Sequence, residues 1–122
     1  MVAVHDERPR RVLVIDDDVA LLRMLRLLLR HSGFDVTTTS NPADALADAI
    51  REQPEVIVLD LAMPRIDGWT LYRELREQAI DARVLILSAY DARAAQRKLG
   101  ADASLAKPFE ADELVERIHQ LV

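Results

Sequence analysis

The sequence predicts an α/β domain with a doubly wound, five-stranded parallel sheet. Three observations support this prediction. Short apolar segments alternate with amphipathic segments five times along the chain. Three of the apolar segments are runs of Val, Ile and Leu with no polar alternation, which is typical of central strands covered on both faces. Strands that alternate with helices form parallel sheets with right-handed crossovers. The 122 residues are enough for one such domain.

Five segments are predicted to be strands. The central ones are Arg11–Asp16, Glu55–Asp60 and Arg83–Ser88. Phe34–Thr39 mixes apolar and polar residues, as an edge strand does, and the short segment Asp102–Ala106 is the candidate for the other edge. Placing the first, third and fourth strands between these edges gives the flavodoxin-like order 2-1-3-4-5.

Five segments place apolar residues at helical spacing. They are Val19–His31, Pro42–Glu52, Gly68–Gln78, Asp91–Leu99 and Phe109–Val122. A turn over Pro64–Gly68 precedes the third of them. Asp18 precedes the first helix and is predicted to be its N-cap, because a carboxylate there accepts from backbone N–H groups two or three residues on.

Composition limits the classes of function. Half of the residues are apolar and 30% are charged, so a packed core with a solvated surface is expected. There are no cysteines, which excludes disulfides and thiolate metal sites. The net charge of −5 disfavours unaided binding to nucleic acid, and no apolar run is long enough to span a membrane. We therefore expect a cytoplasmic domain over residues 11–122, after a polar lead-in over residues 1–10 that does not resemble a signal peptide.

Polar side chains stand where the predicted strands end. Asp16 and Asp17 end the first strand, Asp60 ends the third, Ser88 ends the fourth, and Lys107 follows the fifth. Because the carboxyl ends of parallel strands meet at one edge of the sheet, where ligands bind, these five side chains are expected to converge.

This set of side chains suits phosphoryl transfer. Clustered carboxylates repel one another, and a hard divalent cation relieves the repulsion. Mg²⁺ prefers carboxylate oxygens with water and phosphate oxygens in its other positions, and Mn²⁺ could substitute for it. Lys107 can neutralise a phosphoryl group, and Ser88 can donate a hydrogen bond to it. A carboxylate can also attack phosphorus and form an acyl phosphate.

Four motifs carry a resemblance to a known family. VIDDD, VLDLAMPRIDG, LILSA and LAKPF stand in this order at the ends of the predicted strands. With them, the chain resembles the receiver domain of two-component response regulators, of the chemotaxis-regulator type, from Arg11 to about Val122. The resemblance implies that Asp60 is the phosphoacceptor. It also implies that Mg²⁺ is bound by Asp16, Asp17, Asp60 and the backbone carbonyl of Ala62.

The resemblance implies further roles and partners. Ser88 takes the position of the switch hydroxyl, and Lys107 that of the family's lysine, followed by a peptide bond to Pro108 that is commonly cis. The phosphodonor would be a sensor histidine kinase or a histidine phosphotransfer protein. Output would pass through the face formed by the fourth helix, fifth strand and fifth helix, in a monomer or weak dimer with no membrane or nucleic-acid contact by this domain.

Ser104 departs from the family pattern. An aromatic residue that rotates on activation usually occupies this position, three residues before the lysine. Either switching proceeds through backbone motion and the serine is tolerated, or the domain signals through another surface or is biased toward one state. Tyr90 is a candidate substitute for the aromatic residue; alternatively, it lines the mouth of the site and hinders the hydrolytic water.

Three other functions agree less well with the sequence than a signalling receiver does. A Mg²⁺-dependent phosphohydrolase of the haloacid dehalogenase type needs a second aspartate two residues after the nucleophile, where this chain has Ala62. A flavin-binding flavodoxin needs a phosphate loop after the first strand, and three adjacent carboxylates there would repel the phosphate. A degenerate receiver that only binds partners is disfavoured, because every residue needed for phosphorylation is present.

Overall fold

The computed structural model describes residues 8–63 and 67–122 and confirms the predicted fold class. Its strands are β1 (Arg11–Ile15), β2 (Asp35–Thr39), β3 (Val56–Asp60), β4 (Arg83–Ser88) and β5 (Ala103–Ala106). Its helices are α1 (Val19–His31), α2 (Pro42–Glu52), α3 (Gly68–Glu77), α4 (Ala92–Leu99) and α5 (Ala111–Leu121). The predicted turn over Pro64–Gly68 falls largely on residues 64–66, which lie outside the described residues.

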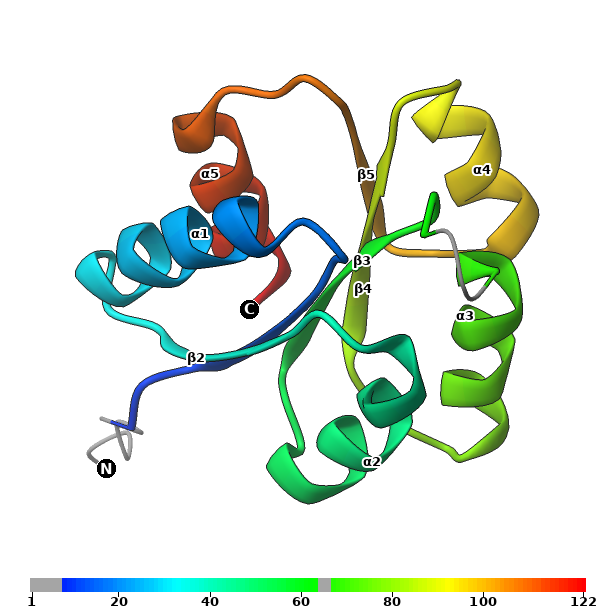
Figure 1. Cartoon of the computed structure of the whole chain (residues 1–122), viewed down its shortest axis with the longest axis horizontal. Coiled ribbons are helices and arrows are strands. Elements are labelled where there is room, and N and C mark those ends of the chain that lie inside the picture. The colour runs from blue at the N-terminus through cyan, green and yellow to red at the C-terminus, as the bar shows by residue number, and fades with distance from the viewer. Residues whose placement is uncertain (1–7, 64–66) are drawn as a thin grey trace, which may run out of the picture.

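The five strands form one parallel sheet in the order β2-β1-β3-β4-β5, as predicted. Figure 1 shows α1 and α5 together on one face of the sheet, with α2, α3 and α4 on the other. Two apolar layers fill the space between the sheet and these two groups of helices. Every residue of β3 is buried, in keeping with its place at the centre of the sheet.

Most helix boundaries follow from capping residues. Asp18, Asn41, Asp67 and Asp91 each accept a backbone N–H of the helix that follows. Asp91 therefore precedes α4 instead of belonging to it, which shortens the predicted helix by one residue. Gly100 ends α4 with φ of 76°, a conformation that glycine adopts without steric cost. Among the described helices, none is both long and apolar enough to cross a membrane.

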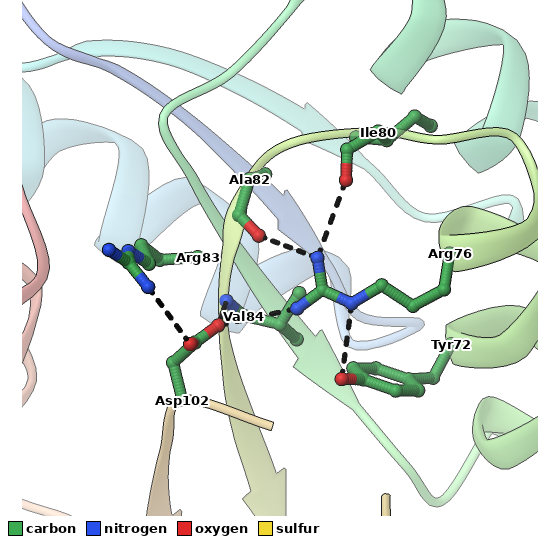
Figure 2. A network of polar contacts seen from close by, with 7 residues as sticks. All are labelled: Tyr72, Arg76, Ile80, Ala82, Arg83, Val84 and Asp102. Carbon is green, nitrogen blue, oxygen red and sulfur yellow. Dashed lines mark hydrogen bonds and ion pairs between the residues drawn. The ribbon is translucent and has the colours of Figure 1, made fainter. Parts of the chain in front are cut away.

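A side-chain network around Arg76 ties the end of α3 to the start of β4 and to the residue before β5 (Figure 2). The Arg76 guanidinium donates to the Tyr72 hydroxyl at 3.1 Å and to the Ala82 carbonyl at 2.8 Å. It also contacts the Asp102 carboxylate at 3.3 Å, and the same carboxylate accepts the Val84 N–H at 2.8 Å. This network lies at the opposite ends of the strands from the polar cluster, so its role is structural.

Replacing Arg76 by alanine is expected to lower the free energy of unfolding by roughly 2–3 kcal/mol, because several partly buried acceptors lose their donor together. Urea denaturation followed by circular dichroism measures the change. Arg73→Ala, at an exposed position on the same helix, is the matched control and should stay within about 0.5 kcal/mol of the parent chain. Equal effects of the two substitutions would contradict a structural role for the network.

Candidate functional site

The central strands bring three carboxylates together. Ile15 at the end of β1 pairs with Leu59 in β3, so the next residues, Asp16 and Asp60, lie side by side at the carboxyl edge of the sheet. Carboxylate oxygens of Asp16, Asp17 and Asp60 lie within 4.8 Å of one another. Asp16 and Asp60 are buried, whereas Asp17 is exposed. The cluster therefore has two fixed carboxylates and one that faces solvent.

Lys107 connects the two buried carboxylates. Its ammonium nitrogen lies 3.0 Å from Asp16 Oδ2 and 3.3 Å from Asp60 Oδ2. The Lys107 N–H also donates to the Ser88 carbonyl at 2.9 Å, which places the residue directly beyond the paired ends of β4 and β5. The peptide bond between Lys107 and Pro108 is cis, as predicted.

Burial and neighbouring charges together set the pKa values of Asp60 and Lys107. Burial raises the pKa of the Asp60 carboxyl above its ordinary value, and the charge of Asp16 raises it further, while the Ala62 N–H and Lys107 lower it. Burial alone would lower the pKa of the Lys107 ammonium, but its hydrogen bond to Asp16 and the charges of Asp16 and Asp60 outweigh that effect and raise this pKa. Lys107 is therefore charged at neutral pH and partly offsets two buried carboxylates.

Backbone groups fix the carboxylate oxygens that Lys107 does not contact. The Ala62 N–H donates to Asp60 Oδ1 at 3.0 Å, and the Asp18 N–H donates to Asp16 Oδ1, also at 3.0 Å. Gly68, at the start of α3, comes close to the same segment, since a Cβ there would lie 2.6 Å from the Leu61 Cα. The start of α3 can thus pack directly against the chain after Asp60.

The Ser88 hydroxyl is hydrogen-bonded within its own loop. Its hydroxyl donates to the Tyr90 carbonyl at 2.6 Å and accepts the Tyr90 N–H at 3.2 Å. The Tyr90 side chain is 84% exposed and borders a cavity of about 360 Å³ that Trp69 and Ala62 also line. Because a hydroxyl has one proton, Ser88 must leave the Tyr90 carbonyl before it can donate to a ligand at Asp60.

Ser104 does not lie in this cluster. It is buried, and its hydroxyl donates to Gln96 Oε1 at 2.7 Å, while its carbonyl accepts from Arg117 Nη1 at 3.0 Å. The sequence prediction did not identify Gln96 or Arg117 as its partners. The sequence carries no direct signal for the contact with Gln96, because the contact depends on how α4 is rotated against β5.

The arrangement of these residues agrees with a comparison against protein families. The family described as the response regulator receiver domain matches residues 12–119. The chain belongs to this family. The phosphohydrolase and flavodoxin interpretations are thereby set aside.

Similar proteins support the assignment. The chain is 44% identical over 115 residues to the transcriptional regulatory protein PrrA of Mycobacterium leprae. The match covers 92% of this chain and 49% of that protein. The chain thus spans about half the length of the curated relatives it matches. The receiver domain of a Francisella response regulator is 36% identical with a TM-score of 0.84, covering 92% of this chain and 95% of that one.

A further solved structure bears on the metal. The response regulator TrrA of Thermotoga maritima, solved in complex with Mg²⁺-BeF, is 31% identical with a TM-score of 0.82. The match covers 93% of this chain and 99% of that one. In the present chain, the three clustered carboxylates have the oxygen chemistry that a hard divalent cation prefers.

Proposed function

We propose that this receiver domain, residues 11–122 after a lead-in over residues 1–10, accepts a phosphoryl group on Asp60 from a phosphohistidine donor. The observation that carries the proposal is the cluster itself, in which Lys107 bridges Asp16 and Asp60 beside the exposed Asp17. A carboxylate oxygen of Asp60 attacks phosphorus, the phosphorus–nitrogen bond breaks, and the imidazole nitrogen keeps the electron pair.

The other residues position and neutralise the transferred group. Asp16, Asp17, Asp60 and the Ala62 carbonyl would hold Mg²⁺, which supplies charge stabilisation for the phosphoryl oxygens when bound. Lys107 provides a second positive charge next to Asp60. The acyl phosphate is later hydrolysed, and the exposed Tyr90 at the mouth of the site narrows the approach of water.

Phosphorylation would act as a switch through Ser88. A phosphoryl group on Asp60 offers strong acceptor oxygens, which compete for the hydroxyl proton that Ser88 now donates to Tyr90. Transfer of that hydrogen bond releases the segment between β4 and α4. We infer that the face formed by α4, β5 and α5 carries the signal to an output domain or effector, in a cytoplasmic monomer or weak dimer.

The proposal is tested by intact-mass measurement after incubation with acetyl phosphate. With Mg²⁺ or Mn²⁺ present, one phosphoryl adduct is expected, and none is expected when the metal is removed with a chelator. A histidine kinase or phosphotransfer protein should give the same adduct. No adduct with any of these donors contradicts the proposal and leaves a receiver that only binds partners.

A further inference from the structure

Ser104 links helices on opposite faces of the sheet. Its hydroxyl donates to Gln96 in α4, and its carbonyl accepts from Arg117 in α5. Figure 1 shows these two helices on either side of β5. Because β5 is an edge strand, the Ser104 contacts join the outermost strand of the sheet to both of its covering helices.

Helix α4 contributes mainly small side chains to the apolar core. Its buried residues are Ala92 and Ala95, whereas α1 buries three leucines. The partly buried Leu99, at the end of α4, also packs against this core. Hydrophobic stabilisation scales with the buried apolar area, so two alanines and one leucine hold α4 less firmly than three buried leucines hold α1. The hydrogen bond from the buried Ser104 to Gln96 at 2.7 Å adds a specific polar contact between this helix and β5.

The two ends of α4 meet the two serines of the neighbouring strands. Ser88 contacts the backbone of Tyr90, just before Asp91 caps the start of α4. At the other end, the Gln96 carbonyl accepts from Gly100 and Ala101 where the helix stops. Gln96 thus fixes both the end of the helix and its contact with Ser104.

Ser88 and Ser104 also face the same layer of helices. Ile86 lies two residues before Ser88 and packs in the apolar layer under α2, α3 and α4. Ser104 pairs with Ile86 in the sheet, so the side chains of Ser88 and Ser104 point to the side that α4 covers. A change at Ser88 reaches the start of α4, and the Gln96–Ser104 hydrogen bond resists movement of its far end.

We propose that the Gln96–Ser104 hydrogen bond is a latch that holds α4 in its unphosphorylated position and thereby opposes phosphorylation of Asp60. This inference rests on the proposed function. In this proposal the contact is lost when α4 moves, so it favours the resting arrangement, and its removal raises the population that accepts the phosphoryl group. One neutral hydrogen bond corresponds to a change of about fivefold in that population.

The test measures the rate of adduct formation at subsaturating acetyl phosphate with Mg²⁺. Ser104→Ala, Gln96→Ala and the double variant should each react about fivefold faster than the parent chain, because either single change already breaks the latch. Arg97→Ala, at the neighbouring exposed position, is the control and should react at the parental rate. Additive effects of the two single changes, or unchanged rates, would overturn the inference.

Hydrogen exchange without metal or phosphodonor gives an independent readout. The Gly100 and Ala101 amides, which end α4, should exchange faster in Ser104→Ala and in Gln96→Ala than in the parent chain or in Arg97→Ala. Faster exchange with an unchanged phosphorylation rate would show a contact that is only structural, and unchanged exchange would show that the bond does not hold α4. Absence of any adduct in the parent chain would instead reject the proposed function.

Discussion

Replacing Asp60 by asparagine should abolish the phosphoryl adduct and, in the presence of a metal chelator, should make the folded chain more stable at neutral pH. The loss of the adduct follows from the chemistry, because a neutral amide lacks the carboxylate nucleophile. The gain in stability follows from burial. Asp60 is 2% exposed beside another buried carboxylate, Asp16, so its negative charge is costly without a cation.

The sign of the pH dependence follows from the Asp60 pKa. Burial raises this pKa above its ordinary value of 3.8, so the folded chain binds the Asp60 proton more tightly than the unfolded chain does. The resulting stabilisation is complete below pH 3.8 and is lost as the pH rises through the higher pKa of the folded state. Asparagine remains neutral, and its amide oxygen can still accept the Ala62 N–H.

Urea denaturation in chelator, repeated across the acidic to neutral range, measures this effect. The parent chain should lose stability relative to Asp60→Asn as the pH rises. Asp81→Asn, an exposed aspartate outside the cluster, should follow the parent. Mg²⁺ should stabilise the parent chain more than Asp60→Asn, since a cation that binds only the folded state shifts the equilibrium towards it. A less stable Asp60→Asn in chelator would mean that Lys107 more than offsets the burial of the charge.

The hydrophobic pattern of the sequence was sufficient to predict the parallel sheet and the carboxylate cluster at its edge. Runs of Val, Ile and Leu in β1, β3 and β4 identify buried strands, and parallel order then brings their carboxyl ends to one edge. The observed pairing of Ile15 with Leu59 explains why the predicted cluster forms, because the residue after each of them is an aspartate. The predicted bounds of β4 are confirmed, whereas the other four predicted strands exceed the observed ones by one residue each, at Asp16, Phe34, Glu55 and Asp102.

Specific side-chain hydrogen-bond partners could not be predicted from the sequence. The Tyr90 contacts of Ser88 depend on the path of the loop between β4 and α4, and Asp91 there has φ of 22°, which no local pattern predicts. The Gln96–Ser104 contact depends on how α4 is rotated against β5. Since alanines on α4 give a weak apolar stripe, the sequence left that rotation undetermined.

Asp17 and Asp18 are matched positions that separate metal binding from fold stability. They are adjacent, exposed and acidic, so replacing either by alanine removes the same charge from nearly the same place. Yet Asp17 contributes an oxygen to the carboxylate cluster, whereas Asp18 Oδ1 accepts the Leu21 N–H at 3.1 Å and caps α1, as predicted. Asp18→Ala should therefore lower the free energy of unfolding by about 1 kcal/mol and leave phosphorylation near the parental rate.

Asp17→Ala should weaken metal-dependent phosphorylation without lowering the free energy of unfolding. Loss of a direct carboxylate should raise the Mg²⁺ concentration for half-maximal adduct formation at least about tenfold, since loss of outer-shell partners alone costs 10–100-fold in metal affinity. Its metal-free stability should not fall, because one of three repelling charges is gone. Mg²⁺ titration followed by fluorescence of Trp69, the single tryptophan, which lines the cavity beside Ser88, measures metal binding directly. Equal metal affinities in the two variants would mean that the cluster needs only the buried pair, Asp16 and Asp60.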